Sequence, residues 1–167
     1  MKNSTIKRTL IDGDGLFFLA EYIKQERLPE GIDFIITPHF MEASRLLVKD
    51  IEEIKKNRLN TCKELASMTG AIAVLKGPAT IVSDGDRSYI NTTGNSGLAT
   101  AGSGDVLSGI IGSFMNQNIS SIEAAIAGVY IHGLCADLYK ETHPAMTMKS
   151  SDIIDNIRKA LSTKDNG

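Results

Sequence analysis

The sequence predicts an α/β fold in which helices flank a partly parallel sheet. Helical patterns alternate with short β-favouring runs along the chain, the order expected of such a fold. Residues 72–75 form a nearly continuous apolar run, typical of a strand that is buried on both faces of a parallel sheet. The 167 residues suit one core of ordinary size, so residues 1–167 are expected to form a single domain.

The front part of the chain contains two β-favouring runs and three helical patterns. The first run, residues 10–12, breaks at Gly13, and the second, residues 34–37, is stopped by Pro38. Helices are predicted over residues 16–23, 41–48 and 51–68, and Gly70 suits the C-cap of the last one.

The rest of the chain begins with a hairpin pattern, in which residues 80–83 and 88–90 flank a turn-forming tetrapeptide. Residues 91–105 are rich in Gly, Thr, Ser and Asn, and a loop of this length is usually functional. Further helices are predicted over residues 106–115, from the capping box of Ser120 and Glu123 to about Tyr139, and over residues 151–161. The predicted strands are few for a sheet with helices on both faces.

Composition and charge exclude several classes of protein. The net charge is −2 and the basic residues are scattered, which argues against a nucleic-acid or membrane surface held by positive charge. The one basic cluster, residues 55–58, is interpreted as the solvated face of a helix. Cys62 and Cys135 lie in apolar helical patterns, so core thiols in a reducing cytoplasm are expected. No secretory leader is recognised at the N-terminus, and no apolar run approaches the roughly 20 residues of a membrane span.

A glycine-rich turn before a helix is the strongest chemical signal. Gly102 and Gly104 let the backbone approach a ligand closely, and the helix that follows presents N–H groups and a dipole that favour an anion. Asp105 is expected in the first turn of that helix, beside the anion site. It can act as a general base, or it can simply cap the helix, and this segment alone leaves both interpretations open.

Polar residues also follow the three predicted strands of the main sheet. Lys76 can meet a phosphate as a point charge, although a surface lysine at a strand end is the commoner case. His39 can bind a substrate or satisfy loop carbonyls. Residues 12–15, Asp-Gly-Asp-Gly, can contact Mg²⁺ through water or form a plain turn with a helix cap. His132 and His143 are interpreted as structural or incidental.

Taken in order, these segments resemble one family. They are Asp12-Gly13-Asp14-Gly15-Leu16, Ile36-Thr37-Pro38-His39 with Glu42, Val74-Leu75-Lys76-Gly77, residues 91–107, and Gly128-Val129-Tyr130-Ile131-His132-Gly133 with Asp137. The family is that of the ADP- or ATP-dependent NAD(P)H-hydrate dehydratases, within the ribokinase-like superfamily. The resemblance extends from about Thr9 to the end of the chain, and residues 91–107 carry it most specifically.

The resemblance implies a nicotinamide-cofactor repair enzyme, a lyase. ADP, or ATP in some members, would phosphorylate the hydroxyl of the hydrates NADHX and NADPHX, and loss of phosphate would restore NADH or NADPH. Mg²⁺ would accompany the nucleotide, with no protein metal site. By position, nucleotide contacts fall on Lys76, Gly77, Pro78, Ala79, Thr80 and Gly104, with Gly102 in the same turn. Hydrate contacts fall on His39 and Asp105, with Asp105 as the catalytic base.

The chain also departs from the family pattern. Phe40 and Met41 stand where the family usually has Pro-Gly, which affects the placing of His39. The family's segment ahead of Asp12, with its N-terminal strands, has almost no counterpart here, so the resemblance implies a partial ribokinase-like domain. Besides an active dehydratase, three alternatives remain: a non-catalytic nucleotide-binding remnant, half of a split protein completed by a partner chain or homo-oligomer, and a small-molecule kinase of the same superfamily.

Overall fold

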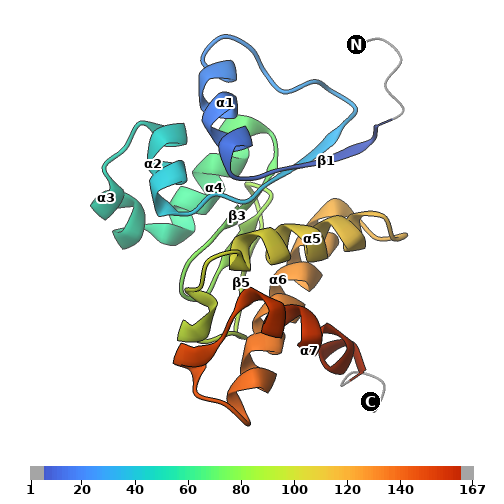
Figure 1. The fold of residues 1–167 in the computed structure, drawn as a ribbon. Coiled ribbons are helices and arrows are strands. Elements are labelled where there is room, and N and C mark those ends of the chain that lie inside the picture. Colours follow the sequence, from blue (N-terminus) through green and yellow to red (C-terminus); the bar gives the residue numbers. More distant parts are fainter. Residues whose placement is uncertain (1–5, 163–167) are drawn as a thin grey trace.

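A five-stranded mixed sheet forms the centre of the fold in a computed structural model that describes residues 6–162 (Figure 1). Residues 1–5, on which the expectation about a secretory leader partly depends, lie outside the described residues. The strand order is β1-β2-β3-β4-β5, with β1, β2 and β3 parallel and the last two strands antiparallel. The strands are β1 (Arg8–Ile11), β2 (Asp33–Ile36), β3 (Ile72–Leu75), β4 (Ile81–Ser83) and β5 (Ser88–Ile90).

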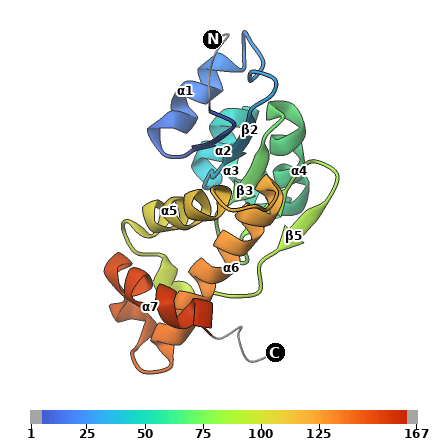
Figure 2. The same cartoon turned by 90° about the vertical axis from the view of Figure 1, so that its right-hand side faces the viewer.

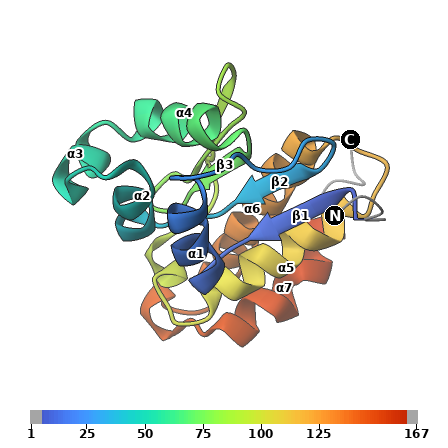
Figure 3. The same cartoon turned by 90° about the horizontal axis from the view of Figure 1, so that it is seen from above.

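The helices lie on both faces of this sheet (Figures 1 and 3). Helices α1–α4 contribute to an apolar core on one face, while α5 and α6 pack against the other face and α7 packs on α5 and α6. The α/β prediction is thus confirmed. The helices are α1 (Asp14–Tyr22), α2 (Phe40–Leu47), α3 (Ile51–Lys56), α4 (Arg58–Thr69), α5 (Ser103–Met115), α6 (Ser121–Lys140) and α7 (Ser150–Ser162), with short 3₁₀ turns η1 (Ser96–Leu98) and η2 (Ala145–Thr147).

Alternation along the short strands explains the two cores. Ile35 and Val74 point towards α5 and α6, whereas Ile36 and Leu75 point towards the opposite helices, and all four side chains are fully buried. A strand that is covered on both faces needs apolar residues at every position, which is the pattern of residues 72–75. This confirms the prediction that β3 is a buried parallel strand.

Two predicted helices differ from the observed ones by more than two residues at a boundary. The single helix expected over residues 51–68 is broken at Asn57, whose φ of −118° and ψ of 39° are not helical, so α3 and α4 are separate. Apolar spacing could not detect this break, because the periodicity continues across it. The other error is at α5, which begins at Ser103 and not at residue 106, so Asp105 belongs to the helix.

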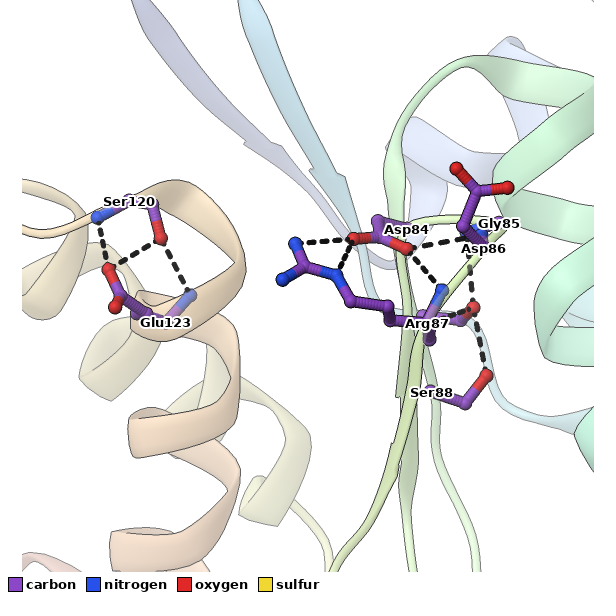
Figure 4. A network of polar contacts seen from close by, with 8 residues as sticks. Asp84, Gly85, Asp86, Arg87, Ser88, Ser120 and Glu123 are labelled. Atoms are coloured by element: carbon purple, nitrogen blue, oxygen red, sulfur yellow. Dashed lines mark hydrogen bonds and ion pairs between the residues drawn. The ribbon is translucent and has the colours of Figure 1, made fainter.

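The predicted hairpin and the capping box before α6 are both confirmed (Figure 4). In the hairpin turn, one Asp84 oxygen accepts from the backbone N–H groups of Asp86 and Arg87, and the other accepts from the Arg87 guanidinium. At the start of α6, the Ser120 hydroxyl accepts from Glu123 N while the Glu123 carboxylate accepts from Ser120 N. The Ser120–Glu123 contacts fix the first turn of α6, the helix that forms one wall of the site described below.

Helix α6 is the central helix of its face of the sheet (Figure 2). Gly128 lets α5 approach closely, since a Cβ at this position would lie 2.5 Å from Ile111 Cγ1. By length and composition alone, the 20 residues of α6 could cross a membrane, which corrects the expectation that no run approaches that length. Most of the helix is buried among the neighbouring elements, and Cys135, like Cys62, is a buried free thiol.

Candidate functional site

The ends of the three parallel strands bring the candidate residues to one edge of the sheet. Asp12 follows β1, His39 follows β2 after two residues, and Lys76 directly follows β3. Because parallel strands point the same way, their carboxyl ends meet at one edge, which is where open α/β sheets bind ligands. A backbone hydrogen bond of 2.8 Å from Lys76 N to Pro38 O ties the second and third of these segments together.

Lys76 lies at the centre of a partly buried charge network. Its Nζ is 2.8 Å from Asp12 Oδ1 and 3.9 Å from Glu42 Oε2. On the other Asp12 oxygen, Ser108 Oγ of α5 donates a hydrogen bond of 2.7 Å. Burial by itself raises the pKa of Asp12, but the hydrogen bonds from Lys76 and Ser108 and the charge of Lys76 outweigh it and hold this pKa below its usual value. The resulting carboxylate fixes the ammonium group over the start of α5.

His39 is the N-cap of α2. Its ring Nδ1 accepts a hydrogen bond of 3.2 Å from the backbone N–H of Glu42, and the backbone N–H of His39 donates to the Glu42 carboxylate at 2.7 Å. The Nε2 atom lies 3.4 Å from Glu42 Oε1, and the His39 side chain stays about half exposed. Glu42 therefore contacts both His39 and Lys76, so one residue expected to touch the hydrate and one expected to touch the nucleotide belong to one network.

The glycine-rich turn presents the N-terminus of α5 to the same place. Gly102 adopts a φ of 81°, in the left-handed region that favours glycine, and is the N-cap of α5. At Gly104 an added Cβ would lie 3.5 Å from Lys76 Nζ, so the ammonium group and the backbone turn face one another across a short gap. Asp105, in the first helical turn, is exposed. A negative group between Lys76 and this turn would meet a positive side chain and a helix N-terminus together.

A cavity of about 460 Å³ opens beside this turn. Its walls come from the segment after β3, the loop after β5, the start of α5 and one face of α6. It is lined by Lys76, Gly77, Pro78, Ala79, Thr80, Asn91, Thr93, Gly94, Asn95, Ser96, Leu98, Ala99, Ser103, Gly104, Leu107, Val129 and His132.

Hydrogen bonds fasten the loop after β5 to α6. The Asp137 carboxylate accepts from Gly94 N at 2.7 Å and from Asn95 Nδ2 at 3.1 Å. Thr93 Oγ1 donates to Tyr130 O at 2.8 Å. Gly133 permits this contact, since a Cβ there would lie 2.7 Å from the carbonyl carbon of Thr93. The back wall of the cavity is therefore held in place by α6.

His132 connects α6 to the glycine-rich turn. Its Nε2 lies 3.0 Å from Ser103 O and 3.2 Å from Ser103 Oγ. Burial disfavours the charged imidazolium and lowers the pKa of His132 to about 4, even though the bond to Ser103 O favours the charged form. The ring is therefore neutral at physiological pH and braces the first residue of α5.

The structure gathers most of the expected nucleotide-contact residues around one cavity. Six of them line it: Lys76, Gly77, Pro78, Ala79, Thr80 and Gly104. Gly102, Asp105 and His39 do not line it, but they lie next to residues of the turn and of the Lys76 network. The sequence predicted a functional loop over residues 91–105 but assigned none of the residues 91–99 to the site, and it interpreted His132 as structural or incidental.

Acidic residues do not form a metal centre in the part of the chain that the structure describes, where no group of three or more His, Cys, Asp or Glu side chains could hold an ion. Asp12 and Glu42 are the carboxylates of the Lys76 network, and both contact the ammonium group. A divalent ion at this site would therefore need most of its oxygen ligands from a bound phosphate and from water, as Mg²⁺ commonly does.

Comparison with known proteins gives consistent matches. A family model described as NAD(P)H-hydrate dehydratase matches residues 2–159. The ADP-dependent (S)-NAD(P)H-hydrate dehydratase of Neisseria meningitidis is 42% identical over 140 residues, which cover 83% of this chain and 47% of the relative. This chain thus spans about half of that relative's length.

Solved structures agree with this match. The ADP/ATP-dependent NAD(P)H-hydrate dehydratase of Bacillus subtilis, co-crystallized with ATP/Mg²⁺ and soaked with CoA, superposes with a TM-score of 0.84 at 29% identity, over 92% of this chain and 55% of that one. A ribokinase-like superfamily protein of Enterococcus faecalis superposes with a TM-score of 0.78 at 29% identity, over 92% of this chain and 52% of that one. The expected ribokinase-like fold is thereby confirmed.

Proposed function

The chain belongs to the NAD(P)H-hydrate dehydratase family, and from that premise we propose that it serves the nucleotide-dependent dehydration of NADHX and NADPHX to NADH and NADPH. ADP or ATP is the phosphoryl donor in this proposal. The residues proposed to bind the nucleotide are Lys76, Gly77, Pro78, Ala79, Thr80, Gly102 and Gly104. Those proposed to contact the hydrate are His39 and Asp105.

One observation carries the proposal, namely that Lys76 faces the N-terminal turn of α5 at the mouth of a cavity lined by the five residues 76–80. A phosphate placed there would accept hydrogen bonds from backbone N–H groups and would lie against an ammonium group that Asp12 already holds in position. The polar loop and the apolar side chains of Leu98, Leu107 and Val129 give the rest of the cavity a mixed lining that suits the remainder of a nucleotide.

Asp105 is proposed as the general base. It lies in the first turn of α5 beside the phosphate position, and its exposed carboxylate can reach a substrate hydroxyl. It would take the proton of the hydrate hydroxyl as the hydroxyl oxygen attacks the terminal phosphorus of the nucleotide and displaces AMP from ADP, or ADP from ATP. Charge that develops on the transferred phosphoryl group would be stabilised by the α5 turn and by Lys76. The lone pair of the ring nitrogen would then expel phosphate, and loss of a ring proton would complete the dehydration.

Mg²⁺ is proposed to arrive with the nucleotide. Its chemistry is to neutralise phosphate charge, and phosphate oxygens and water would supply most of its ligands. Of the described residues, Asp12 and Glu42 are the acidic side chains of the network next to the phosphate position. A cytoplasmic location is part of the same proposal, and the two buried free thiols are consistent with a reducing compartment.

The decisive experiment is to incubate the protein with NADHX and either ADP or ATP and to follow the absorbance of the NADH that forms. Binding of the nucleotide is measured separately by calorimetry. Asp105→Asn should lower turnover by about 10²–10⁴-fold while leaving nucleotide affinity nearly unchanged, because a base acts on the chemical step. Full activity of Asp105→Asn would show that the proposed mechanism is wrong. A phosphorylated product without NADH would instead indicate a small-molecule kinase.

A second candidate is a nucleotide-binding chain that becomes active only when more polypeptide completes the hydrate side, from a partner chain or a second copy. The observation in its favour is that β1 forms an edge of the sheet, next to α1 with its exposed Phe17 and Phe18. Attaching the strands of a longer relative ahead of this domain should raise its unfolding midpoint if they cover this edge. Equal midpoints with and without the added strands would exclude that role for them.

A further inference from the structure

Phe40, one of the two residues that stand in place of the family's Pro-Gly, packs against the segment expected to bind the nucleotide. A Cβ added to Gly77 would lie 2.5 Å from Phe40 Cζ and 3.1 Å from Phe40 Cε1, so the ring edge rests directly on the glycine backbone. The Gly77 φ of 153° is a conformation that residues with side chains rarely adopt. Phe40 is also the first residue of α2, next to the N-cap His39. The adjacent residues His39 and Phe40 thus lie at the proposed hydrate contact and beside the proposed nucleotide segment, respectively.

Arg58 holds Phe40 and the same segment from the other side. Its guanidinium carbon lies 5.6 Å from the centroid of the Phe40 ring, within the range of a cation–π contact. One of its terminal nitrogens donates a hydrogen bond of 2.8 Å to Ala79 O. Ala79 has a φ of 48°, which is unfavourable for a residue with a Cβ and has to be held by its surroundings.

Arg58 lies at a position that is energetically unfavourable for a cation. It is the first residue of α4, where the helix dipole disfavours a cation. Within residues 6–162 no carboxylate forms an ion pair with it, and its buried Nε lacks a hydrogen-bond partner. The break at Asn57 separates Arg58 from α3 and starts a new helix at the residue that reaches Ala79. The contacts with Phe40 and Ala79 are therefore the interactions of the Arg58 guanidinium that the structure shows.

We propose that Phe40 and Arg58 are positioning residues that set the conformation of residues 77–80 and thereby the affinity for the nucleoside di- or triphosphate. This inference rests on the proposed function only in assigning a nucleotide to the cavity. Neither side chain lines the cavity, so both act through the backbone of Gly77 and Ala79. The predicted signature is a higher KM and Kd for the nucleotide with little change in kcat.

The test uses the whole chain with ADP as the probe. Phe40→Leu keeps apolar volume but removes the ring face, and Arg58→Ala removes both the stacked cation and the bond to Ala79. Each is expected to raise the Kd for ADP about five- to tenfold, as removal of one such contact does elsewhere. Because they act on one segment, the double variant should bind ADP about as weakly as either single variant, and not with the product of the two losses. Arg58→Lys, which can still donate to Ala79 O, should recover part of the affinity.

Matched controls are Phe18→Leu and Arg158→Ala, an exposed aromatic and an exposed arginine away from the cavity, which should leave the Kd unchanged. An unchanged Kd in Phe40→Leu and Arg58→Lys, or losses that simply multiply in the double variant, would overturn the inference. If Arg58→Ala unfolds, Phe40→Leu and Arg58→Lys still decide the question. ADP binding without NADHX turnover in the unaltered chain would contradict the proposed function alone, since the Kd comparison does not need turnover.

Discussion

The two sides of the candidate site differ in how completely they are enclosed. On the cavity side, the loop after β5 is bonded to α6, and Asn91 and Ser103 are only 5% exposed. On the other side, His39 is half exposed, and α1, which packs beside α2, exposes 54% of Phe17 and 68% of Phe18. The described residues thus form well-fastened walls along one side of the cavity of about 460 Å³, whereas they leave the region around His39 and α1 open.

The largest pH-dependent effect is predicted for the enclosed side and its buried His132. The pKa of His132 is about 4 in the folded chain, against about 6.5 when unfolded, so between these values only the unfolded state binds the proton. Stability from this group should therefore be complete above about pH 6.5 and should fall by about 3 kcal/mol as the pH drops to about 4. Urea unfolding of the unaltered chain and of His132→Gln between pH 7 and 4 measures the effect.

The control for this prediction lies in the same titration. The pKa of Asp12 is lowered from its ordinary value of 3.8, so its stabilisation is lost mainly as the pH falls below that value, at and beyond the acid end of the His132 window. The same loss of stability in His132→Gln over this window would mean that another group is responsible.

A smaller effect is expected from Lys76→Met, which keeps the aliphatic stem and removes the charge that faces the α5 turn. Loss of one charge-assisted phosphate contact should weaken ADP binding by about tenfold or more, equivalent to at least about 1.4 kcal/mol. Calorimetry measures the affinity. Because the variant also leaves Asp12 without its cation, Lys76→Met with Asp12→Asn serves as the matched control for unpaired charge. Unchanged ADP affinity in both would show that the phosphates bind elsewhere.

The smallest effect is predicted on the open side. Phe18→Ser should change the free energy of unfolding by no more than about 0.5 kcal/mol, because the side chain is 68% exposed. Its neighbour Leu19 is 4% exposed and provides the contrast, since Leu19→Ala should cost about 2–5 kcal/mol. Chemical denaturation compares the two. A large loss in Phe18→Ser would show that this face is covered in solution, for instance by a second copy.

The sequence predicted those elements whose pattern is local and missed a break that depends on tertiary contacts. Strands β2 and β3 were recognisable because burial on both faces demands continuous apolar residues, and α6 was recognisable from its capping box. The break at Asn57 was not, because apolar spacing continues through it and the contacts of Arg58 with Phe40 and Ala79 are tertiary. For the same reason the interpretation of residues 55–58 as a solvated helix face is confirmed for residues 55–57, which are exposed, and is wrong for Arg58, which is partly buried.

The residues of the candidate site that belong to a local sequence pattern could be predicted. The Gly102–Asp105 turn and Lys76 could be identified by their chemistry and position after predicted elements. The partnership of Lys76 with Asp12 joins residues 64 positions apart, and that of Asp12 with Ser108 joins residues 96 apart, so neither had a local signal. His132 was interpreted as structural or incidental, and only the packing of α6 against α5 shows that it braces Ser103 and lines the cavity.

The cap at the start of α2 also determines the protonation chemistry of His39. A backbone N–H can only donate, so the Nδ1 atom that accepts from Glu42 N must carry a lone pair. A neutral His39 ring therefore bears its proton on Nε2, next to a Glu42 oxygen. The helix cap thus selects one tautomer of the imidazole, and a ligand that reaches this ring meets a hydrogen-bond donor whose direction is set by the first turn of α2.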